Sequence, residues 1–364
     1  MSMLWSPAVE NLRPYTPGEQ PRQTGLTKLN TNENPFGPSP RVADAIQSWP
    51  TEKLKLYPDP ESMELRLALA EIHGVDVDQI FVGNGSDEVL AHAFCALFRQ
   101  DLPILMPDIS YGFYRTYCQL YGIAHIEMPL DKKFRVNVDD YTQPCGGVVF
   151  ANPNAPTGVA IASGEIECLL AMHPNRAVLV DEAYVDFGGD SVIPLIASYP
   201  NLLVTRTFSK SRGLAGIRVG YALGSPELVS GLNRVKNSFN SYPLSMLSSA
   251  AAIASLEDHN YFVQTVCKIV HLRQKLVGAL VNLGLTVLPS STNFVFATHP
   301  NCSAAILVAG LRQRGVIVRN FDIPRIRDFM RITVGSESDC QALLSALEQV
   351  LRESSEAKLT LQAV

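Results

Sequence analysis

Two ionisable side chains, those of Asp181 and Lys210, each follow a short apolar run that is typical of a buried β-strand. A carboxylate that leaves an apolar strand loses most of its hydration, so it needs a cationic partner or holds its proton to an unusually high pH. A lysine held among small residues near a strand end is a candidate nucleophile that can form a Schiff base. The plainer interpretations are a helix cap or an ion pair for the carboxylate and a solvated surface position for the lysine. Three arginines follow or precede that lysine closely: Arg206, Arg212 and Arg218.

Two further turns close predicted strands with residues that could bind a ligand. Gly83-Asn84-Gly85-Ser86-Asp87 places two glycines before a predicted helix, and the free backbone N–H groups of such a helix start bind anions such as phosphate. The segment lacks the Gly-Lys-Ser/Thr of a nucleotide-binding loop and the third glycine of a dinucleotide motif. Asn152-Pro153-Asn154-Ala155-Pro156-Thr157-Gly158 holds an amide side chain in a proline-rich loop, for which an ordinary turn is the simpler interpretation.

Each of these signals is weak alone, but together they match the requirements of pyridoxal 5′-phosphate (PLP). That cofactor needs a lysine for its Schiff base, a carboxylate that keeps the pyridine nitrogen protonated, donors to its phenolic oxygen and ligands for its phosphate. Lys210, Asp181, the 152–158 loop with Tyr184, and the 83–87 turn follow strand ends in this chain and could supply these functions. A protonated ring nitrogen makes the ring an electron sink for the carbanion that forms when the substrate Cα loses its proton.

The elements that must position these residues are predicted by the alternation of short apolar runs with helical patterns. The runs lie at 80–82, 103–106, 124–127, 147–150, 177–180, 202–204 and 218–223, with helical patterns such as 61–73 and 86–100 among them. Such alternation predicts an α/β domain with a mostly parallel, seven-stranded sheet, whose site lies beyond the carboxyl ends of the strands.

The two ends of the chain differ from this middle part. After Pro226 helical patterns dominate up to residue 283, and strands at 293–297, 316–319 and 330–334 with a helix at 337–351 predict a smaller α+β domain. The first 40 residues are too rich in proline for a long helix, so they form either an ordered strap over a site or a surface tail. We therefore divide the chain into an N-terminal strap (1–40), a large PLP-binding domain (41–258) and a small domain (259–364).

The composition excludes several functional classes. The 364 residues are 46% hydrophobic and 18% charged, which rules out disorder as the main state. A net charge of −5 gives no basic footprint for nucleic acid, and no apolar run is long enough to cross a membrane. The seven cysteines and seven histidines are scattered, so we expect neither disulfides nor a metal site. With no signal-peptide pattern at the start, we expect a cytoplasmic protein.

The most specific motif lies within the first 40 residues. It comprises Asn11-Leu12-Arg13-Pro14-Tyr15 and Leu29-Asn30-Thr31-Asn32-Glu33-Asn34-Pro35-Phe36-Gly37-Pro38-Ser39-Pro40. Together with Asp181-Glu182-Ala183-Tyr184 and the Ser209-Lys210 pair, these segments resemble the fold-type I PLP-dependent aminotransferases, most closely the histidinol-phosphate aminotransferase family. The resemblance covers nearly the whole chain. It implies transamination of L-histidinol phosphate with 2-oxoglutarate, giving imidazole-acetol phosphate and L-glutamate in histidine biosynthesis, by a homodimer with shared active sites.

The resemblance also implies a set of cofactor contacts. Lys210 would carry the cofactor and move the proton between Cα and C4′, Asp181 would pair with the pyridine nitrogen, and Tyr184 would donate to the phenolic oxygen. Many relatives carry asparagine directly before Pro-Thr-Gly, where this chain has Ala155, so we assign a second contact with the phenolic oxygen to Asn154. The other implied contacts are phosphate binding by Gly85, Ser86, Asp87, Ser209 and Arg218, ring stacking by Tyr111, and a reach to the phosphate of the neighbouring subunit by Tyr57.

The resemblance extends to residues that would bind the substrate. Arg331 matches the family arginine that holds the α-carboxylate, for which a bidentate guanidinium is well suited. Arg319 would meet the phosphate of histidinol phosphate or the side-chain carboxylate of glutamate, and Tyr15 and Asn293 would line the pocket. We expect three further tyrosines to pack as a helix face without a chemical role: Tyr114, Tyr117 and Tyr121.

Three alternative functions fit much of the same pattern. An aromatic amino acid aminotransferase also accepts a flat ring, and a phosphate-binding arginine such as Arg319 would argue against it. A PLP-dependent decarboxylase acting on a phosphorylated amino acid would release carbon dioxide instead of forming glutamate. A binding or regulatory protein on this fold would lack the colour of a lysine Schiff base, which the substitution Lys210→Ala abolishes in the enzyme.

Overall fold

The computed structural model describes residues 4–362, and a seven-stranded sheet is its main framework. All neighbouring strands run parallel, except that one strand next to an edge is antiparallel to both of its neighbours. This arrangement confirms the predicted α/β class. The order across the sheet is β2 (Ile80–Gly83), β8 (Gly220–Gly224, the antiparallel strand), β7 (Leu202–Thr207), β6 (Val178–Asp181), β5 (Gly147–Ala151), β3 (Ile104–Pro107) and β4 (His125–Met128).

Both faces of this sheet are covered by helices, so its central strands are buried along their length. Leu179 of β6 packs in a core with the helices of one face, whereas Val178 and Val180 pack in a core with those of the other. Strands buried on both faces appear as continuous apolar runs without alternation, as observed here. The helices of the first face are α4 (Ser86–Leu97), α5 (Phe113–Tyr121) and α7 (Pro226–Phe239), and those of the second are α3 (Met63–His73), α6 (Ser163–Met172) and α8 (Met246–Glu257).

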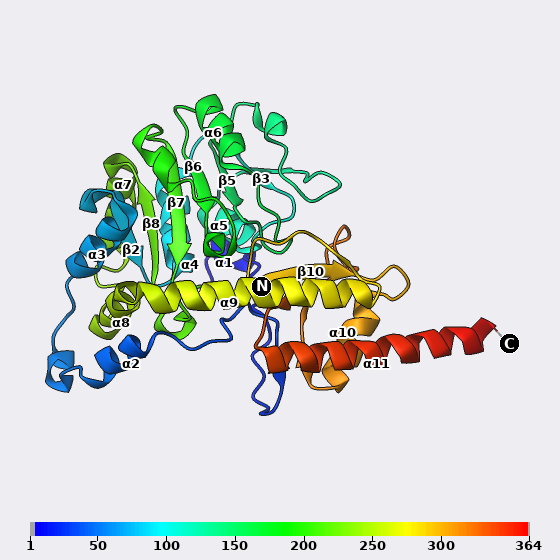
Figure 1. Ribbon diagram of the computed structural model, residues 1–364. Coiled ribbons are helices and arrows are strands. Elements are labelled where there is room, and N and C mark those ends of the chain that lie inside the picture. Colours follow the sequence, from blue (N-terminus) through cyan, green and yellow to red (C-terminus); the bar gives the residue numbers. More distant parts are fainter. Residues whose placement is uncertain (1–3, 363–364) are drawn as a thin grey trace.

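A second, antiparallel sheet lies in the C-terminal part of the chain and has a core of its own. The helix α9 (His259–Asn282) is 24 residues long and runs beneath both parts of the molecule, as the yellow helix of Figure 1 shows. The remaining elements of this part are β12 (Arg319–Asn320), β13 (Phe329–Thr333), β10 (Phe294–Thr298) and β9 (Thr286–Val287) in sheet order, with α10 (Ala304–Gln313) and α11 (Glu337–Gln362).

The N-terminal strap is tied to this second part by backbone pairing. Its strand β1 (Thr27–Lys28) pairs in parallel with β11 (Val316–Ile317). The predicted single strand at 316–319 is therefore wrong, because β11 pairs with the strap while β12 pairs with β13. The division of the chain at residues 40 and 258 stays a prediction. The short helices are α1 (Pro7–Glu10), α2 (Pro40–Gln47), η1 (Thr51–Lys55), η2 (Val77–Gln79), η3 (Val138–Tyr141), η4 (Val185–Phe187), η5 (Ile193–Ala197) and η6 (Ala215–Ile217).

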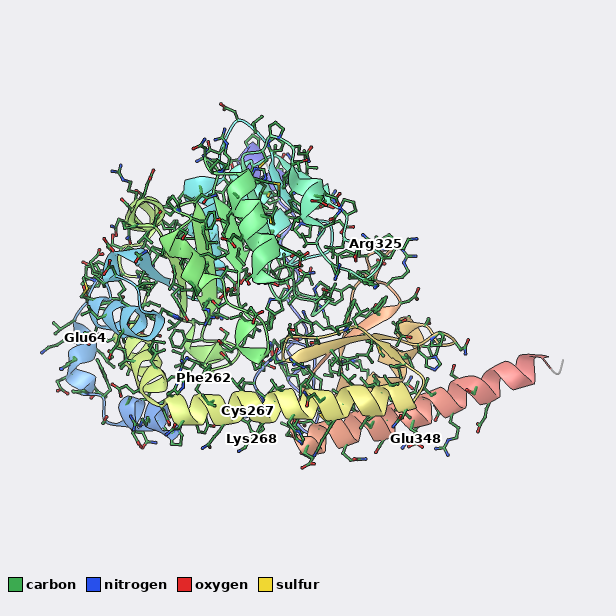
Figure 2. All side chains as sticks on the ribbon, turned by 45° about the horizontal axis from the view of Figure 1, so that its top comes forward. Glu64, Phe262, Cys267, Lys268, Arg325 and Glu348 are labelled. Carbon is green, nitrogen blue, oxygen red and sulfur yellow. The ribbon has the colours of Figure 1, made fainter. Side chains whose placement is uncertain are left out.

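Specific side chains join the two sheets and the strap. Arg325, labelled in Figure 2, follows β12 and donates to Asp108 Oδ2 at 2.5 Å, directly after β3 of the large sheet. Lys268 of α9, also labelled there, lies 5.7 Å from the ring centre of Phe36 in the strap. These contacts fix the three parts around the carboxyl ends of the parallel strands. Within residues 4–362, none of the helices has the length and apolar composition needed to cross a membrane.

Candidate active site

A cavity of about 400 Å³ lies where the carboxyl ends of the central strands meet the strap. Strands β6 and β7 end in Asp181 and Thr207 at its wall, and the strap contributes Glu33. Sites at this edge are typical of parallel α/β sheets, because successive strand ends bring their loops together there. The predicted residues that line this cavity are Ser86, Asp87, Tyr111, Asp181, Tyr184, Ser209, Lys210 and Arg218.

Asp181 presents a buried carboxylate to this cavity. Its side chain accepts hydrogen bonds from the Tyr114 hydroxyl at 2.9 Å and from the Ala183 backbone N–H at 3.1 Å. The residue is only 4% exposed, and burial raises the pKa of its carboxyl to about 6 although both hydrogen bonds lower it. No cation among residues 4–362 forms a salt bridge with it. A buried carboxylate beside a cavity and without a cation is a receptor for a cationic ligand atom.

Lys210 lies in the loop that follows β7, and its amine reaches the same cavity. The Nζ atom donates to the Thr31 carbonyl oxygen at 3.2 Å. The loop itself is fixed from the strap, since the Asn34 amide donates to the carbonyl oxygens of Lys210 and Ser211, each at 3.0 Å. On the other side, the Ser211 hydroxyl donates to Asp186 Oδ2 at 2.5 Å. The amine therefore projects from an anchored loop.

The start of α4 and Arg218 form a polar cradle at another wall of the cavity. Gly85 has a φ of +82°, and a Cβ atom there would lie 2.4 Å from Arg218 Nη2, so only glycine fits. A Cβ atom on Gly220 would lie 2.3 Å from the Ser86 nitrogen. Arg218 has a left-handed φ of +58°, rare for a side chain of this kind, and its Nη2 lies 3.1 Å from Asp87 Oδ2. Backbone N–H groups and a guanidinium meet here, as anion binding requires.

The Tyr111 ring lines the next wall, and the rings of Tyr15 and Phe113 pack near it. The Tyr111 hydroxyl donates to Asp87 Oδ1 at 2.8 Å, and burial raises the pKa of this phenol well above its ordinary value. The strap residue Tyr15 stacks on Phe113 with ring centres 4.4 Å apart and lies 6.0 Å from the Tyr111 ring. A neutral, flat wall of this kind suits a planar ligand.

Comparison with known proteins places this site in a family. A model of the family described as aminotransferase class I and II matches residues 24–347. The chain is 55% identical to histidinol-phosphate aminotransferase of Gluconacetobacter diazotrophicus over 98% of its own length and 100% of that protein. It is also 55% identical to histidinol-phosphate aminotransferase 1 of Pseudomonas aeruginosa, over 95% and 99% of the two chains. The chain belongs to the histidinol-phosphate aminotransferase family.

A solved structure of this family agrees with the fold. Histidinol-phosphate aminotransferase from Sinorhizobium meliloti, in complex with pyridoxal-5'-phosphate, matches with a TM-score of 0.87 and 26% sequence identity. The match covers 97% of this chain and 99% of that one. The predicted fold type, that of the PLP-dependent aminotransferases, is thereby confirmed.

Arg331, the candidate carboxylate ligand of the family, lies on β13 beside this cavity. Its Nη2 donates to the Asn30 carbonyl oxygen at 3.0 Å, while its buried Nε atom has no partner among residues 4–362. The guanidinium lies 5.3 Å from the ring centre of Phe294, which packs edge-on against Tyr184. A buried N–H group without an acceptor costs free energy, so this side chain is suited to donate hydrogen bonds to an anionic ligand group.

Two of the predicted site residues are not among the described residues that line this cavity. Asn154 is not among the described residues that line the cavity, because its amide donates to the Ile109 carbonyl oxygen and the Thr157 hydroxyl and its Oδ1 accepts from Ser110. Asn293 is fully buried and donates to the Asn32 carbonyl oxygen, so it supports the strap instead of lining the pocket. Contacts of these two side chains with the ligands stay predictions.

Arg319, predicted to meet the phosphate or side-chain carboxylate of a substrate, contacts the strap in this structure. Its Nη1 and Nη2 atoms donate to the carbonyl oxygens of Pro17 and Thr16 at 3.2 and 3.1 Å. The guanidinium therefore holds the strap over the site and is already engaged. Arg206 likewise points away from the cavity, where it pairs with Glu182 and Asp186.

Sequence reasoning missed other residues of the site. Tyr114, predicted to pack without a chemical role, is fully buried and donates to Asp181. Its position three residues after Tyr111 on one helix face was the available signal. Glu33 lines the cavity and is paired with Lys28, yet the sequence marked it only as part of a family motif. Tyr57 is not among the described residues that line this cavity and is 81% exposed.

Proposed function

We propose that this chain transfers the amino group of L-histidinol phosphate to 2-oxoglutarate, giving imidazole-acetol phosphate and L-glutamate, with PLP as its cofactor. The observation that carries the proposal is the meeting of Lys210 and Asp181 in one cavity, in a chain of the histidinol-phosphate aminotransferase family. An amine for the aldehyde and an acid for the ring nitrogen are the two groups that PLP chemistry requires of the protein. The seven free cysteines favour a cytoplasmic location.

The residues present suit PLP in charge and in shape. The Asp181 carboxylate has no cation beside it among residues 4–362, so a protonated pyridine nitrogen would supply the missing partner. The helix start at Ser86 together with Ser209 and Arg218 would bind the phosphate. The Tyr111 ring would cover one face of the pyridine. Glycines at positions 85 and 220 let Arg218 and the start of α4 come this close together, because a Cβ atom at either position would collide with them.

The chain's own residues would then divide the work of the reaction. When bound, PLP withdraws electrons from the substrate Cα. Lys210 would remove the Cα proton as a general base and return it at the cofactor carbon C4′ as a general acid. Asp181 would keep the pyridine nitrogen protonated, and Tyr184 would donate a hydrogen bond to the phenolic oxygen. Arg331 would bind the glutamate α-carboxylate, whose place on Cα is taken in histidinol phosphate by the phosphate ester arm.

A rate comparison tests this proposal. Purified enzyme with PLP is assayed for glutamate formation from 2-oxoglutarate with histidinol phosphate or phenylalanine as amino donor. We expect histidinol phosphate to be the better donor by kcat/KM. A higher value for phenylalanine would favour an aromatic aminotransferase, and release of carbon dioxide without glutamate would favour a decarboxylase. The variant Lys210→Ala is the matched control and should form no glutamate.

We further propose that the enzyme acts as a homodimer with shared sites. The exposed Tyr57 ring stacks on Tyr242 at 4.8 Å, outside the cavity of its own chain, and three further large apolar side chains are exposed on the same or the adjacent segments: Leu54, Leu56 and Phe239. Exposed apolar clusters of this kind mark interaction surfaces. Sedimentation should give twice the mass of one chain. Mixing Lys210→Ala with Tyr57→Ala subunits should restore activity, because one site of each hybrid would then be intact; no gain on mixing would contradict shared sites.

A further inference from the structure

At the position directly before Pro-Thr-Gly, the wall of the cavity carries no amide side chain. Ala155, which lines the cavity, stands in the position directly before Pro-Thr-Gly, and a methyl group cannot donate a hydrogen bond. The neighbouring Asn154 cannot compensate, because both of its amide hydrogens are already donated within the protein. Neither position 154 nor position 155 therefore offers a second donor beside the Tyr184 hydroxyl, and the direction of its hydrogen matters more than it would beside such a donor.

The strap residue Asn32 contacts that hydroxyl directly. Its Nδ2 atom lies 2.8 Å from Tyr184 Oη, and the residue is 1% exposed. Asn32 adopts a left-handed φ of +57°, and the structure pairs its other polar groups as well. Its backbone N–H donates to the Thr333 hydroxyl, its carbonyl oxygen accepts from Asn293, and its Oδ1 accepts from Thr333.

These bonds fix the direction of every hydrogen in the chain of contacts. The Thr333 oxygen accepts from the Asn32 N–H, so its own hydrogen is free to be donated to Asn32 Oδ1. Because Oδ1 is held in this way, the amide must turn its NH₂ group toward Tyr184. The amide can only donate at that end, so the Tyr184 oxygen accepts and its hydrogen points elsewhere. Tyr184 lines the cavity, so a ligand bound there could accept this hydrogen.

We propose that Asn32 is a positioning residue that turns the Tyr184 hydroxyl hydrogen toward the phenolic oxygen of the cofactor, and that it thereby compensates for the amide absent at Ala155. The inference rests on the proposed function, since it needs PLP in this cavity. It also links the three parts of the molecule, because Asn32 belongs to the strap, Thr333 to the second sheet and Tyr184 to the loop that follows β6 of the large sheet. The Tyr184 hydroxyl is then correctly oriented only when the strap, which carries Asn32, is in place.

The test uses the visible absorbance of the PLP-loaded protein as a function of pH. A donor to the phenolic oxygen stabilises the negative charge on it, and this favours the deprotonated form of the Schiff base with Lys210. Losing the donor therefore raises the pH midpoint of the absorbance change. For Tyr184→Phe we expect a rise of about one to two pH units. For Asn32→Gly we expect about half a unit to one unit, because the hydroxyl remains but is no longer oriented. Glycine accepts the left-handed φ without strain.

A double-mutant cycle separates orientation from a merely structural effect. If Asn32 acts through the hydroxyl, then Asn32→Gly changes nothing once Tyr184→Phe is present. An equal shift in both backgrounds, or no shift in the single variant, overturns the inference. The rescue variant carries Ala155→Asn together with Asn32→Gly, and its midpoint should return toward the wild-type value. An unchanged midpoint in that variant overturns the claim that one amide compensates for the other.

Two controls complete the design. Asn30→Ala alters a buried amide of the same strap that donates to the Glu19 carbonyl oxygen and has no bond to Tyr184 in the described residues, so its midpoint should stay at the wild-type value. The charged groups of the site are the same in all variants and cannot cause the differences: Asp181, Lys210, Glu33 and Arg331. If wild-type protein with PLP gives no pH-dependent visible band, the proposed function itself fails; a normal band with additive shifts defeats only the role of Asn32.

Discussion

The buried carboxylate of Asp181 should weaken the cofactor-free protein in a pH-dependent way. Its ordinary pKa of 3.8 rises to about 6 in the folded chain, a difference of about 2.2 units. Each unit of pKa difference corresponds to roughly 1.36 kcal/mol. The free energy of unfolding is therefore about 3 kcal/mol lower at pH values above both pKa values than it would be without the shift. The sign follows from proton binding. Between pH 4 and 6 the folded state holds more protons than the unfolded state, so stability falls as the pH rises through this window and is level above it.

Asp181→Asn removes this penalty while keeping an oxygen that accepts from Tyr114. Relative to wild type, the cofactor-free variant should gain about 3 kcal/mol in unfolding free energy at pH 8 but only about 1 kcal/mol at pH 4.5. Urea denaturation of both proteins without PLP, at these two pH values, measures the difference. Any pH-independent effect of the new amide on the free energy of unfolding cancels when the differences at the two pH values are compared. The same offset at both pH values would refute the reasoning, because it would mean that the carboxylate is not destabilised by burial.

Two further substitutions test other parts of the cofactor site by equilibrium titration with PLP. Tyr114→Phe deletes a hydrogen bond to the Asp181 carboxylate and should weaken PLP binding about tenfold, whereas an unchanged Kd would show that this tyrosine only packs. Arg218→Lys loses the guanidinium of the polar cradle and should weaken PLP binding by about tenfold or more while leaving the affinity for pyridoxal, which has no phosphate, nearly unchanged. An equal loss for both ligands would place the arginine away from the phosphate.

The chemistry of the strand ends could be predicted from the sequence because it follows from two general rules. Parallel strands end at one edge of the sheet, and a charged residue that follows an apolar strand must find a partner there. Asp181 and Lys210 satisfy both rules, and the structure brings them to one cavity. The fold class followed from the same runs, since strands buried on both faces need no alternation.

The contacts that the sequence could not predict depend on the local direction of the chain or on distant partners. Asn154 and Ala155 are adjacent, yet only the alanine faces the cavity, because backbone dihedrals of a loop decide which side each residue faces. Tyr114 donates to a strand 67 residues further along the chain, and helical periodicity shows only that it is buried. Arg319 binds strap carbonyls some 300 residues away. The spacing of residues along the chain holds no information about such partners.

Reduction with borohydride, followed by peptide mass spectrometry, tests the central claim most directly. The reagent makes the bond between PLP and its lysine permanent, so the modified peptide identifies the amine that holds the cofactor. We predict one phosphopyridoxyl group per chain, on the peptide that contains Lys210, with loss of the label in Lys210→Ala. A label on another lysine, or none on any, would contradict the account.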